Sequence, residues 1–334
     1  MRAVAALMVF GSHLRLLHVL EPARVFRDGY TGVTFFFILS GMVLAWSQPE
    51  DGRARTFWWR RFVRVWPATA VAVIFAWLAF GAPIGSKALL ALGINLALLQ
   101  PWSTDALYVF SPNGQTWSLG CEAFFYAGFP LLVYVLRRLD SHPRIALTAA
   151  WGLATMGASL LPLWFHDRTF GLITYVNPVV RSGEFVLGVA LALELQRRGP
   201  WRVQVWHGAA ALVIAELLIW AGLPARTATS LLTPGFLLLL AAGASADLTG
   251  RSRLLQWRWA QYAGQLSFAF YLVHATVLVY LVRHYPQQGV VRGAGLAAVG
   301  LVLATAVAAL LHHGVELPVQ RRLVGRPAVS SGPA

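Results

Sequence analysis

The sequence opens with Arg2-Ala-Val-Ala-Ala-Leu-Met-Val-Phe-Gly-Ser-His13-Leu-Arg15, an apolar run with a basic residue at its start and an imidazole inside it. If this run is an α-helix, the step from Arg2 to His13 rotates through about 1100°, roughly 20° past three whole turns. Arg2 and His13 then lie on one face, about 16 Å apart along the axis. The stretch therefore predicts a helix that carries a cation at the edge of an apolar layer and an imidazole within that layer.

Similar apolar runs recur along the whole sequence and indicate a membrane protein. Of the 334 residues, 57% are hydrophobic and only 12% are charged. Repeated runs of about fifteen to twenty apolar residues leave almost no polar surface for a water-soluble fold. The sequence therefore predicts an all-α, polytopic transmembrane helical bundle. Because the first run carries polar residues and lacks a small-residue cleavage site, we expect it to be retained rather than removed as a signal peptide.

The order of the apolar runs predicts the topology. Candidate membrane segments lie near residues 3–20, 31–47, 66–82, 87–100, 117–136, 145–163, 177–195, 206–221, 228–245, 262–282 and 293–313. The segment 88–99 is too short to span a bilayer at about 1.5 Å per residue, so we interpret it as re-entrant or interfacial. About ten full crossings then make up one transmembrane domain, residues 1–323. Arginine-rich connections between the runs should face the cytoplasm, which puts both termini on the cytoplasmic side of a cell inner or plasma membrane.

The charge balance and the cysteine content narrow the partners. A net charge of +14 would suggest nucleic acid in a soluble chain, but here the arginines gather in short loops, so we expect membrane lipid and no nucleic acid. Cys121 is the single cysteine and lies in an apolar run, which offers neither a disulfide framework nor a thiolate site, and we expect no metal. Residues 324–334 are rich in Pro, Ser, Ala and Gly and are predicted to form a disordered tail.

The densest cationic patch is Thr56-Phe-Trp-Trp-Arg60-Arg61-Phe-Val-Arg64-Val-Trp-Pro67. On a helix, Arg61 and Arg64 are three residues apart and share a face, and Arg60 lies four residues before Arg64. Guanidinium groups bind phosphate in a bidentate manner, so the patch suits the phosphates of a nucleotide-containing cofactor. Attraction to anionic lipid is an equally good interpretation of these residues alone.

Several polar residues lie inside apolar runs. Ser118, Glu122 and Tyr126 repeat every four residues and line one stripe of a helix. A carboxylate about one turn inside a membrane is energetically costly and normally faces a partner or a watery cavity. Glu122 is therefore a functional candidate, and a structural ion pair is the main alternative.

Two further groups of polar residues are predicted on helix faces. Arg181 and Glu184 are three residues apart, and we favour mutual neutralisation, with a polar chamber shared with Glu122 as the alternative. Ser267, Tyr271 and His274 follow the helical spacing of four and three on one face. Hydrogen-bonded packing explains this face as well as catalysis does.

Small residues near the second run, Gly29, Gly32, Ser40 and Gly41, predict close helix packing rather than chemistry. At the other end of the sequence, Pro318 is expected to terminate the last span at the cytoplasmic surface, because the residue before a proline disfavours helix.

Taken together, these stretches resemble the membrane-bound acyltransferase 3 family over almost the whole length. The matching motifs are Arg2 with His13, the run 32–41, Arg61 and Arg64 with Trp66-Pro67, Trp117-Ser118 with Glu122 and Phe125-Tyr126, Arg181 with Glu184-Phe185 and Gly188, Ser267 with Tyr271 and His274, and Glu316 with Pro318. The resemblance implies an integral membrane enzyme that moves an acyl group, most often acetyl, from acyl-coenzyme A to a hydroxyl of a carbohydrate or another small acceptor. Some members carry a further soluble hydrolase-like domain after the membrane unit, and we expect this chain to act without one or with a partner.

The same resemblance assigns roles to residues. His13 would be the catalytic imidazole, Arg2 its partner on the same helix, and Glu122 a member of the polar active-site set. Coenzyme A would be bound by Arg61 and Arg64. Beyond these assignments, we expect Arg60 of the same cationic patch to contribute to the coenzyme A site. We expect the substrates to be contacted by Trp117, Ser118, Arg181, Glu184, Tyr271 and His274.

The residues support this chemistry without the family. Acyl transfer to an alcohol needs a base that takes the hydroxyl proton, and a neutral imidazole with a pKa near ~6.5 suits that task. We expect His13 to stay neutral among apolar side chains. Two other classes remain open on the residues alone: a transporter whose intramembrane His13, Glu122, Arg181 and His274 line a path, and a non-catalytic assembly subunit. The residues alone do not determine the acceptor, acyl lengths beyond acetyl, the oligomeric state or whether the chain starts upstream of Met1.

Overall fold

The computed structural model describes residues 1–17, 28–49, 52–165, 168–224, 227–252, 256–285 and 290–324. Over these ranges the regular secondary structure is entirely helical, which confirms the predicted all-α fold. Ten residues of the predicted tail, 325–334, lie outside the described ranges.

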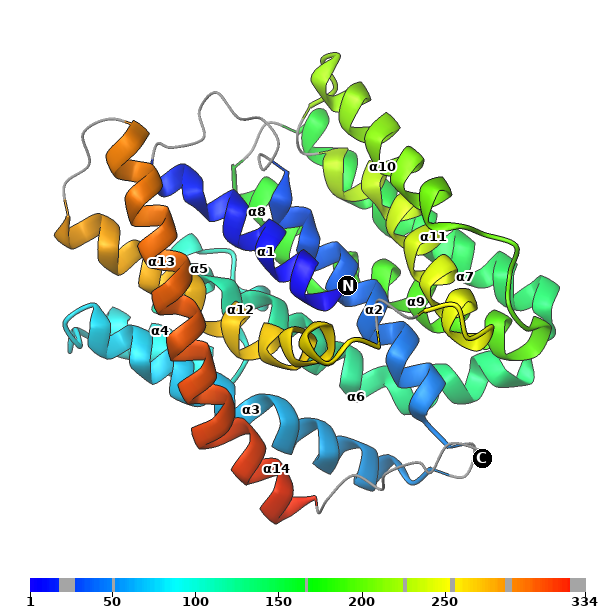
Figure 1. The fold of residues 1–334 in the computed structure, drawn as a ribbon, viewed down its shortest axis with the longest axis horizontal. Helices are drawn as coiled ribbons and strands as arrows, with labels where there is room; N and C mark the ends of the chain where they lie inside the picture. Colours follow the sequence, from blue (N-terminus) through cyan, green and yellow to red (C-terminus); the bar gives the residue numbers. More distant parts are fainter. Residues whose placement is uncertain are drawn as a thin grey trace.

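The α-helices follow one another along the chain and pack into a single bundle (Figure 1). Their bounds are α1 Arg2–His13, α2 Gly32–Ser47, α3 Ala54–Ala79, α4 Ser86–Leu96, α5 Ala106–Phe110, α6 Trp117–Arg138, α7 Ser141–Leu160, α8 Arg168–Val176, α9 Pro178–Arg198, α10 Val205–Trp220, α11 Ala228–Leu248, α12 Arg258–His284, α13 Val290–Leu311 and α14 Leu317–Leu323. Short 3-10 turns link several of them, and a π-helical turn, His312–Glu316, joins α13 to α14.

Within the described residues, eight helical segments are long and apolar enough to cross a membrane, so the chain is a multi-pass membrane protein. These segments contain α2, α3, α6, α7, α9, α11, α12 and the α13–α14 pair. The other two predicted crossings correspond to α1 and α10, which have 12 and 16 residues. The run predicted to be too short to span is α4, which has 11 residues.

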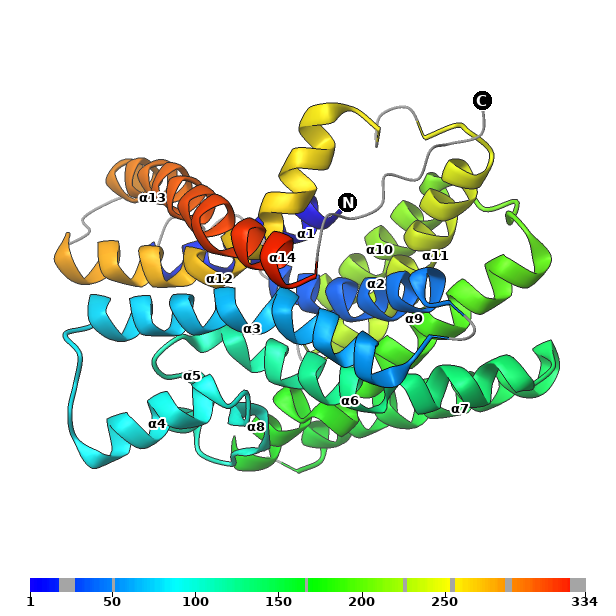
Figure 2. The same ribbon diagram turned by 90° about the horizontal axis from the view of Figure 1, so that it is seen from below.

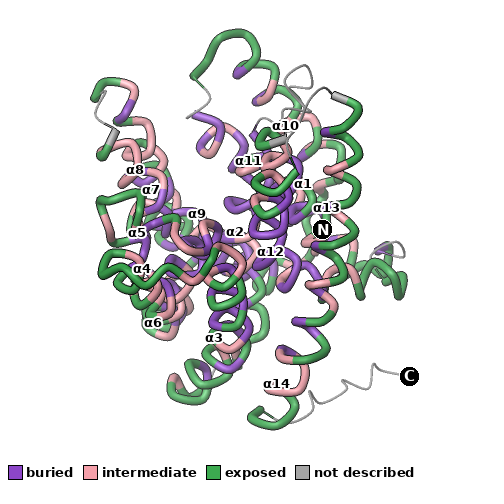
Figure 3. The backbone as a smooth tube through the Cα atoms, turned by 90° about the vertical axis from the view of Figure 1, so that its left-hand side faces the viewer, coloured by how far each residue is buried: buried purple, intermediate pink, exposed green. Residues whose placement is uncertain are grey.

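The central helices are those that bury most of their surface. Within their most apolar windows, α9 and α12 bury 78% of their residues, whereas α7 and the α13–α14 segment bury 22%. Figure 3 shows the buried backbone gathered in α2, α9 and α12. Two apolar clusters make up the core, one mainly from α2, α6, α9 and α11 and the other mainly from α1, α3, α12 and α13. Figure 2 shows α12, α3 and α6 side by side.

The predicted close packing of small residues is confirmed, most clearly between α2 and α9. A Cβ atom added to Gly41 would collide with the carbonyl oxygen of Phe185, and one added to Gly188 would collide with the carbonyl oxygen of Ile38. Glycines at the start of α2 are pressed against the backbone of α1 in the same way. Because glycine has no Cβ, the backbones approach closely enough to fix α2 between α1 and α9.

The prediction that Pro318 ends the last span is wrong. Pro318 is the second residue of α14, which continues to Leu323 after the π-helical turn. The first turn of a helix leaves its N–H groups without intrahelical partners, so a proline there loses no hydrogen bond. The turn is closed by the carboxylate of Glu316, 2.7 Å from Nδ1 of His312.

Candidate active site

Two cavities lie at opposite ends of α1. The larger one, here the histidine cavity, has a volume of about 1010 Å³ and is bounded by the last turn of α1, the ends of α3 and α12, and the first turns of α6 and α9. The smaller one, here the arginine pocket, has a volume of about 330 Å³ and is bounded by the start of α1, the end of α2 and the first halves of α3 and α12. Helices α1 and α3 contribute opposite ends to the two cavities, whereas α2, α6 and α12 reach both cavities from the same or adjacent positions.

The arginine pocket gathers three guanidinium groups. Arg2 comes from α1, and Arg61 and Arg64 come from α3, so the predicted shared face of the cationic patch is confirmed. The Nε atoms of Arg2 and Arg61 are buried and have no hydrogen-bond partner among the described residues. A buried donor without an acceptor is costly, so the pocket suits an anionic ligand that supplies acceptor oxygens. Arg60, by contrast, is exposed and does not line the pocket.

A carboxylate lies in the same pocket. Glu122 accepts a hydrogen bond from the hydroxyl of Tyr126, with 2.7 Å between the oxygens, and the Tyr126 oxygen lies 3.3 Å from Oγ of Ser40. This contact confirms the predicted helical stripe. Glu122 lines the same pocket as Arg2, Arg61 and Arg64, so the pocket places three guanidinium groups around one carboxyl group.

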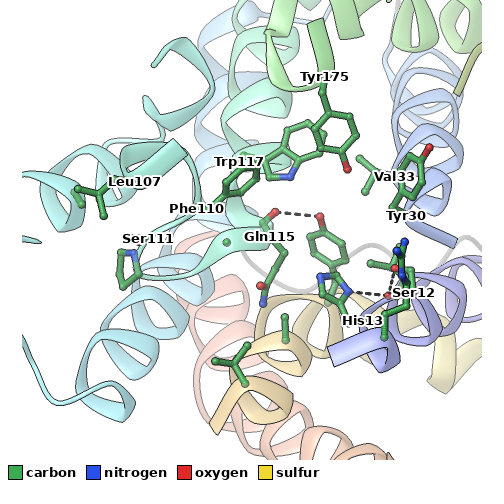
Figure 4. Close-up of a pocket in the computed structure, with 18 of the residues that line it drawn as sticks. Ser12, His13, Tyr30, Val33, Leu107, Phe110, Ser111, Gln115, Trp117 and Tyr175 are labelled. Carbon is green, nitrogen blue, oxygen red and sulfur yellow. Dashed lines mark hydrogen bonds between the residues drawn. The ribbon is translucent and has the colours of Figure 1, made fainter. Parts of the chain in front are cut away.

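His13 lines the histidine cavity and is half-buried (Figure 4). Its Nδ1 lies 2.8 Å from the carbonyl oxygen of Val9. A carbonyl oxygen only accepts, so Nδ1 carries the hydrogen and the neutral ring keeps its lone pair on Nε2. Ser12 donates to the same carbonyl at 2.7 Å. The helix backbone thus selects the tautomer in which the second nitrogen is free to take a proton.

Aromatic rings form the wall across the cavity from His13. Trp117 packs against Tyr175 with ring centroids 5.0 Å apart, and Tyr30 meets the same tyrosine edge-on at 5.9 Å. Figure 4 shows Trp117 and Tyr175 on the side facing His13. A large cavity with aromatic walls and a few polar groups is typical of a site for an organic ligand.

Arg181 supports that wall. Its guanidinium donates to Glu184 and to Thr34, each at about 3.1 Å, and to the carbonyl oxygen of Tyr175 at 3.2 Å. The group also lies over the rings of Trp117 and Tyr175. The predicted neutralising pair is therefore confirmed, and Glu184 lies behind the cavity wall rather than on it.

Two side chains, Tyr271 and Val33, line both cavities. The Tyr271 hydroxyl donates to the carbonyl oxygen of Gln115 at 3.0 Å and lies 2.8 Å from Oγ of Ser118. Ser118 itself lines the arginine pocket. These contacts place Tyr271 in the partition between the two cavities.

His274 lies behind His13 and off the walls of both cavities. Its ring is fully buried and meets the His13 ring edge-on, with centroids 5.1 Å apart. Nδ1 of His274 lies 2.9 Å from the carbonyl oxygen of Tyr271. Hydrogen-bonded packing, one of the two predicted explanations of this helix face, accounts for these contacts.

Tyr175 and Gln115 are two of the histidine-cavity residues that were not predicted from the sequence. Tyr175 is at the end of α8, just before the Asn177-Pro178 start of α9. Gln115 is in the turn before α6 and donates through its side-chain amide to the carbonyl oxygen of Leu272 at 2.8 Å. Gln115 lies in a turn, and Tyr175 lies on the short helix α8, where Gly171 and Thr174 also line the cavity. No apolar run was predicted over residues 168–176, so the sequence offered no helix face on which to find Tyr175.

Several proteins of similar sequence are named as acyltransferases. A family model described as "Acyltransferase domain" matches residues 1–313. The chain is 31% identical to "Acyltransferase MdmB" of Streptomyces mycarofaciens in an alignment that covers all of this chain and 93% of that protein. It is 26% identical to "Peptidoglycan O-acetyltransferase OatA" of Listeria monocytogenes, over 58% of this chain and 32% of that protein.

A further relative is "Putative peptidoglycan O-acetyltransferase YrhL" of Bacillus subtilis, which is 24% identical over 96% of this chain and 54% of its own length. The chain thus spans about a third to a half of the length of the two peptidoglycan relatives. No solved structure gives a significant match.

Proposed function

Because this chain belongs to the acyltransferase family whose model it matches, we propose that it moves an acyl group, normally acetyl, from acyl-coenzyme A to a hydroxyl of a carbohydrate or glycosylated acceptor. The chain is an enzyme that transfers acyl groups, and the family places it among enzymes rather than transporters. What we propose is the identity of the acyl donor, of the catalytic base and of the acceptor.

The observation that carries the proposal is that α1 places one functional residue in each cavity. Its first residue is an arginine suited to the donor, and its last residue is the imidazole suited to act as the base. Arg2 lies in the arginine pocket, and His13 lies in the histidine cavity with its Nε2 lone pair free. A helix of 12 residues is about 18 Å long, so a donor that enters at the arginines must extend into the bundle to reach the imidazole. Acyl-coenzyme A, with its anionic head and its long arm ending in a thioester, has that shape.

The reaction needs one base and one leaving group. Nε2 of His13 takes the proton from the acceptor hydroxyl while the oxygen attacks the thioester carbonyl. The new carbon–oxygen ester bond forms, the carbon–sulfur bond breaks, and the thiolate leaves with the electron pair. The imidazolium then returns its proton to the thiolate, so the products are the ester and free coenzyme A. General base catalysis by a positioned imidazole contributes typically about 10²- to 10⁴-fold to the rate.

The arginine pocket supplies the donor site in this proposal. Arg2, Arg61 and Arg64 offer charge-assisted hydrogen bonds to phosphate oxygens, and the buried Nε atoms of Arg2 and Arg61 would gain the acceptors that they lack. With a volume of about 330 Å³, the pocket is at the small end of the range for ligand sites, so it suits the arm of the donor. The nucleotide would lie further out, near the exposed Arg60.

The histidine cavity supplies the acceptor site. Its aromatic wall suits the apolar face of a sugar ring, and His13 lies across from that wall. Two relatives are named as peptidoglycan O-acetyltransferases, which supports a hydroxylated carbohydrate as the acceptor class. The end of α2 lines the arginine pocket, and it is contacted by Arg137 at the end of α6 and by Gln196 near the end of α9. The arginine-rich ends of α6 and α9 therefore lie on the side of that pocket. We place that pocket, both termini and coenzyme A on the cytoplasmic side of the plasma membrane, with the acceptor entering from the opposite side.

The test uses membrane vesicles from cells that make the full chain, supplied with acetyl-coenzyme A carrying an isotopically labelled acetyl group. Mass spectrometry of the glycan fraction measures the label, and vesicles from cells without the protein give the background. We expect label on glycan hydroxyls with the unaltered protein and only background with His13→Ala at equal protein amounts. Equal labelling by the two proteins would remove His13 from the mechanism, and label at background with both would refute the transfer.

A further inference from the structure

The geometry points to Tyr271, together with Val33, as a fixed port between the donor and acceptor cavities that limits the length of the acyl group passed to His13. This inference rests on the proposed function, because it concerns the route of the donor's thioester. Tyr271 would determine which acyl group is transferred, and this effect can be measured separately from the ability to transfer acetyl.

The port follows from the division of the site. Arg2, Arg61 and Arg64, which we assign to the donor, line the arginine pocket, whereas His13 lines the histidine cavity together with Arg15, Arg181 and Arg283. The thioester carbonyl must therefore reach the imidazole across the partition. Tyr271 and Val33 are the residues that both cavities share in the described part of the chain, and they are only 6% and 4% exposed. The partition at these two side chains is therefore closely packed, and a thioester that crosses it must pass beside them.

The hydroxyl and the ring of Tyr271 are both held by neighbouring residues, so the side chain acts as a fixed wall rather than a swinging gate. Its hydroxyl is tied to Gln115 and Ser118 at 3.0 and 2.8 Å. Its ring meets Phe36 edge-on at 5.8 Å and lies 5.8 Å from the His274 ring on its own helix. A ring packed between two others while its hydroxyl makes two hydrogen bonds has no free rotamer to adopt.

A rigid wall discriminates by size. A chain that is one methylene too long for a well-packed site loses about 10- to 200-fold in transfer efficiency. Acetyl, the shortest common acyl group, is therefore the one that the port admits most readily. Tyr271→Ala, which leaves only a methyl side chain, should admit longer acyl chains. Tyr271→Phe, which removes only the hydroxyl, should leave the ring and the size limit in place.

The experiment measures kcat/KM with acetyl-, propanoyl- and butanoyl-coenzyme A in the vesicle assay. For the unaltered protein we expect butanoyl to be used at least about tenfold less efficiently than acetyl. Tyr271→Ala and Val33→Ala should each raise the butanoyl-to-acetyl ratio by about tenfold or more. Tyr271→Phe should keep the original ratio. Tyr280→Ala is the matched control, because Tyr280 is on the same helix, is exposed and lines neither cavity.

The butanoyl-to-acetyl ratio of kcat/KM tests the port independently of the proposed function. If Tyr271→Ala and Val33→Ala transfer acetyl with an unchanged ratio, the port is refuted while the transferase remains. If Tyr271→Ala does not fold, Val33→Ala decides by the same criterion. An equal rise in Tyr280→Ala would also refute the port, because a general loosening of α12 would then explain the change. If no acyl-coenzyme A supports transfer by the unaltered protein, both the port and the proposed function fail.

Discussion

Replacing Arg61 with alanine tests whether the cationic patch binds the donor or merely attracts lipid. Arg61 lines the arginine pocket, and its Nε is buried without a partner. A hydrogen bond to a charged group contributes about 1.5–3 kcal/mol. At about 1.4 kcal/mol per factor of ten, the loss of one such bond raises the KM for acetyl-coenzyme A by about 10- to 100-fold.

The neighbouring Arg60 is the matched control. It carries the same charge on the same helix but is exposed and does not line the pocket. An exposed ion pair contributes about 1 kcal/mol or less, so Arg60→Ala should raise that KM by about fivefold at most. Both variants should leave kcat close to the original value, because neither residue touches the hydroxyl that is acylated.

Initial rates of coenzyme A release at a series of acetyl-coenzyme A concentrations give both constants. The reasoning requires a clear difference in KM between Arg61→Ala and Arg60→Ala. Equal effects of the two variants would refute it and would favour the interpretation in which the patch acts through lipid or a diffuse field. Repeating the series at higher salt should weaken the Arg60 effect more than the Arg61 effect, because exposed charges are screened more strongly.

Three further variants test the packing and the polar contacts. Gly188→Ala should destabilise the protein by about 1–3 kcal/mol or more, because the added Cβ meets the backbone of α2. Gly157 has open space around it, so Gly157→Ala should have little effect. Thermal unfolding in detergent compares the two variants. Arg181→Met should cost about 3–5 kcal/mol by leaving Glu184 buried and unpaired, and a variant that also replaces Glu184 with Met should recover most of that loss in the same measurement. Tyr126→Phe removes the hydrogen bond to Glu122 and should lower kcat/KM by about tenfold or more if the carboxylate acts in the site; an unchanged kcat/KM would assign that bond to packing.

Helical spacing predicted those contacts of the site that form between residues on the same helix. The helical repeat gave the contact between Glu122 and Tyr126 and the pair formed by Arg181 and Glu184, because residues three or four apart meet on one helix face whatever the rest of the fold does. The glycines that allow α2 to approach its neighbours were also readable, because no other residue lacks a Cβ.

The contacts between distant segments were beyond any periodicity argument. Tyr271 and Ser118 lie 153 positions apart, and their hydrogen bond depends on how α6 and α12 pack. The division of the site into two cavities has the same origin, because it follows from where five or more helices meet. The π-helical turn before Pro318 was missed because its hydrogen-bond pattern has no residue signature, and a proline after an apolar run normally marks a helix end.

Rescue of a His13→Ala enzyme by added imidazole tests the central claim most directly. The truncation leaves an opening beside a cavity of about 1010 Å³, which is large enough for free imidazole to enter. The account predicts that His13→Ala lowers kcat by about 10²- to 10⁴-fold with little change in the KM for acetyl-coenzyme A, and that imidazole restores a measurable part of the rate. A kcat equal to that of the unaltered protein, or a loss that appears wholly in the donor KM and is unaffected by imidazole, would contradict the role of His13 as the base.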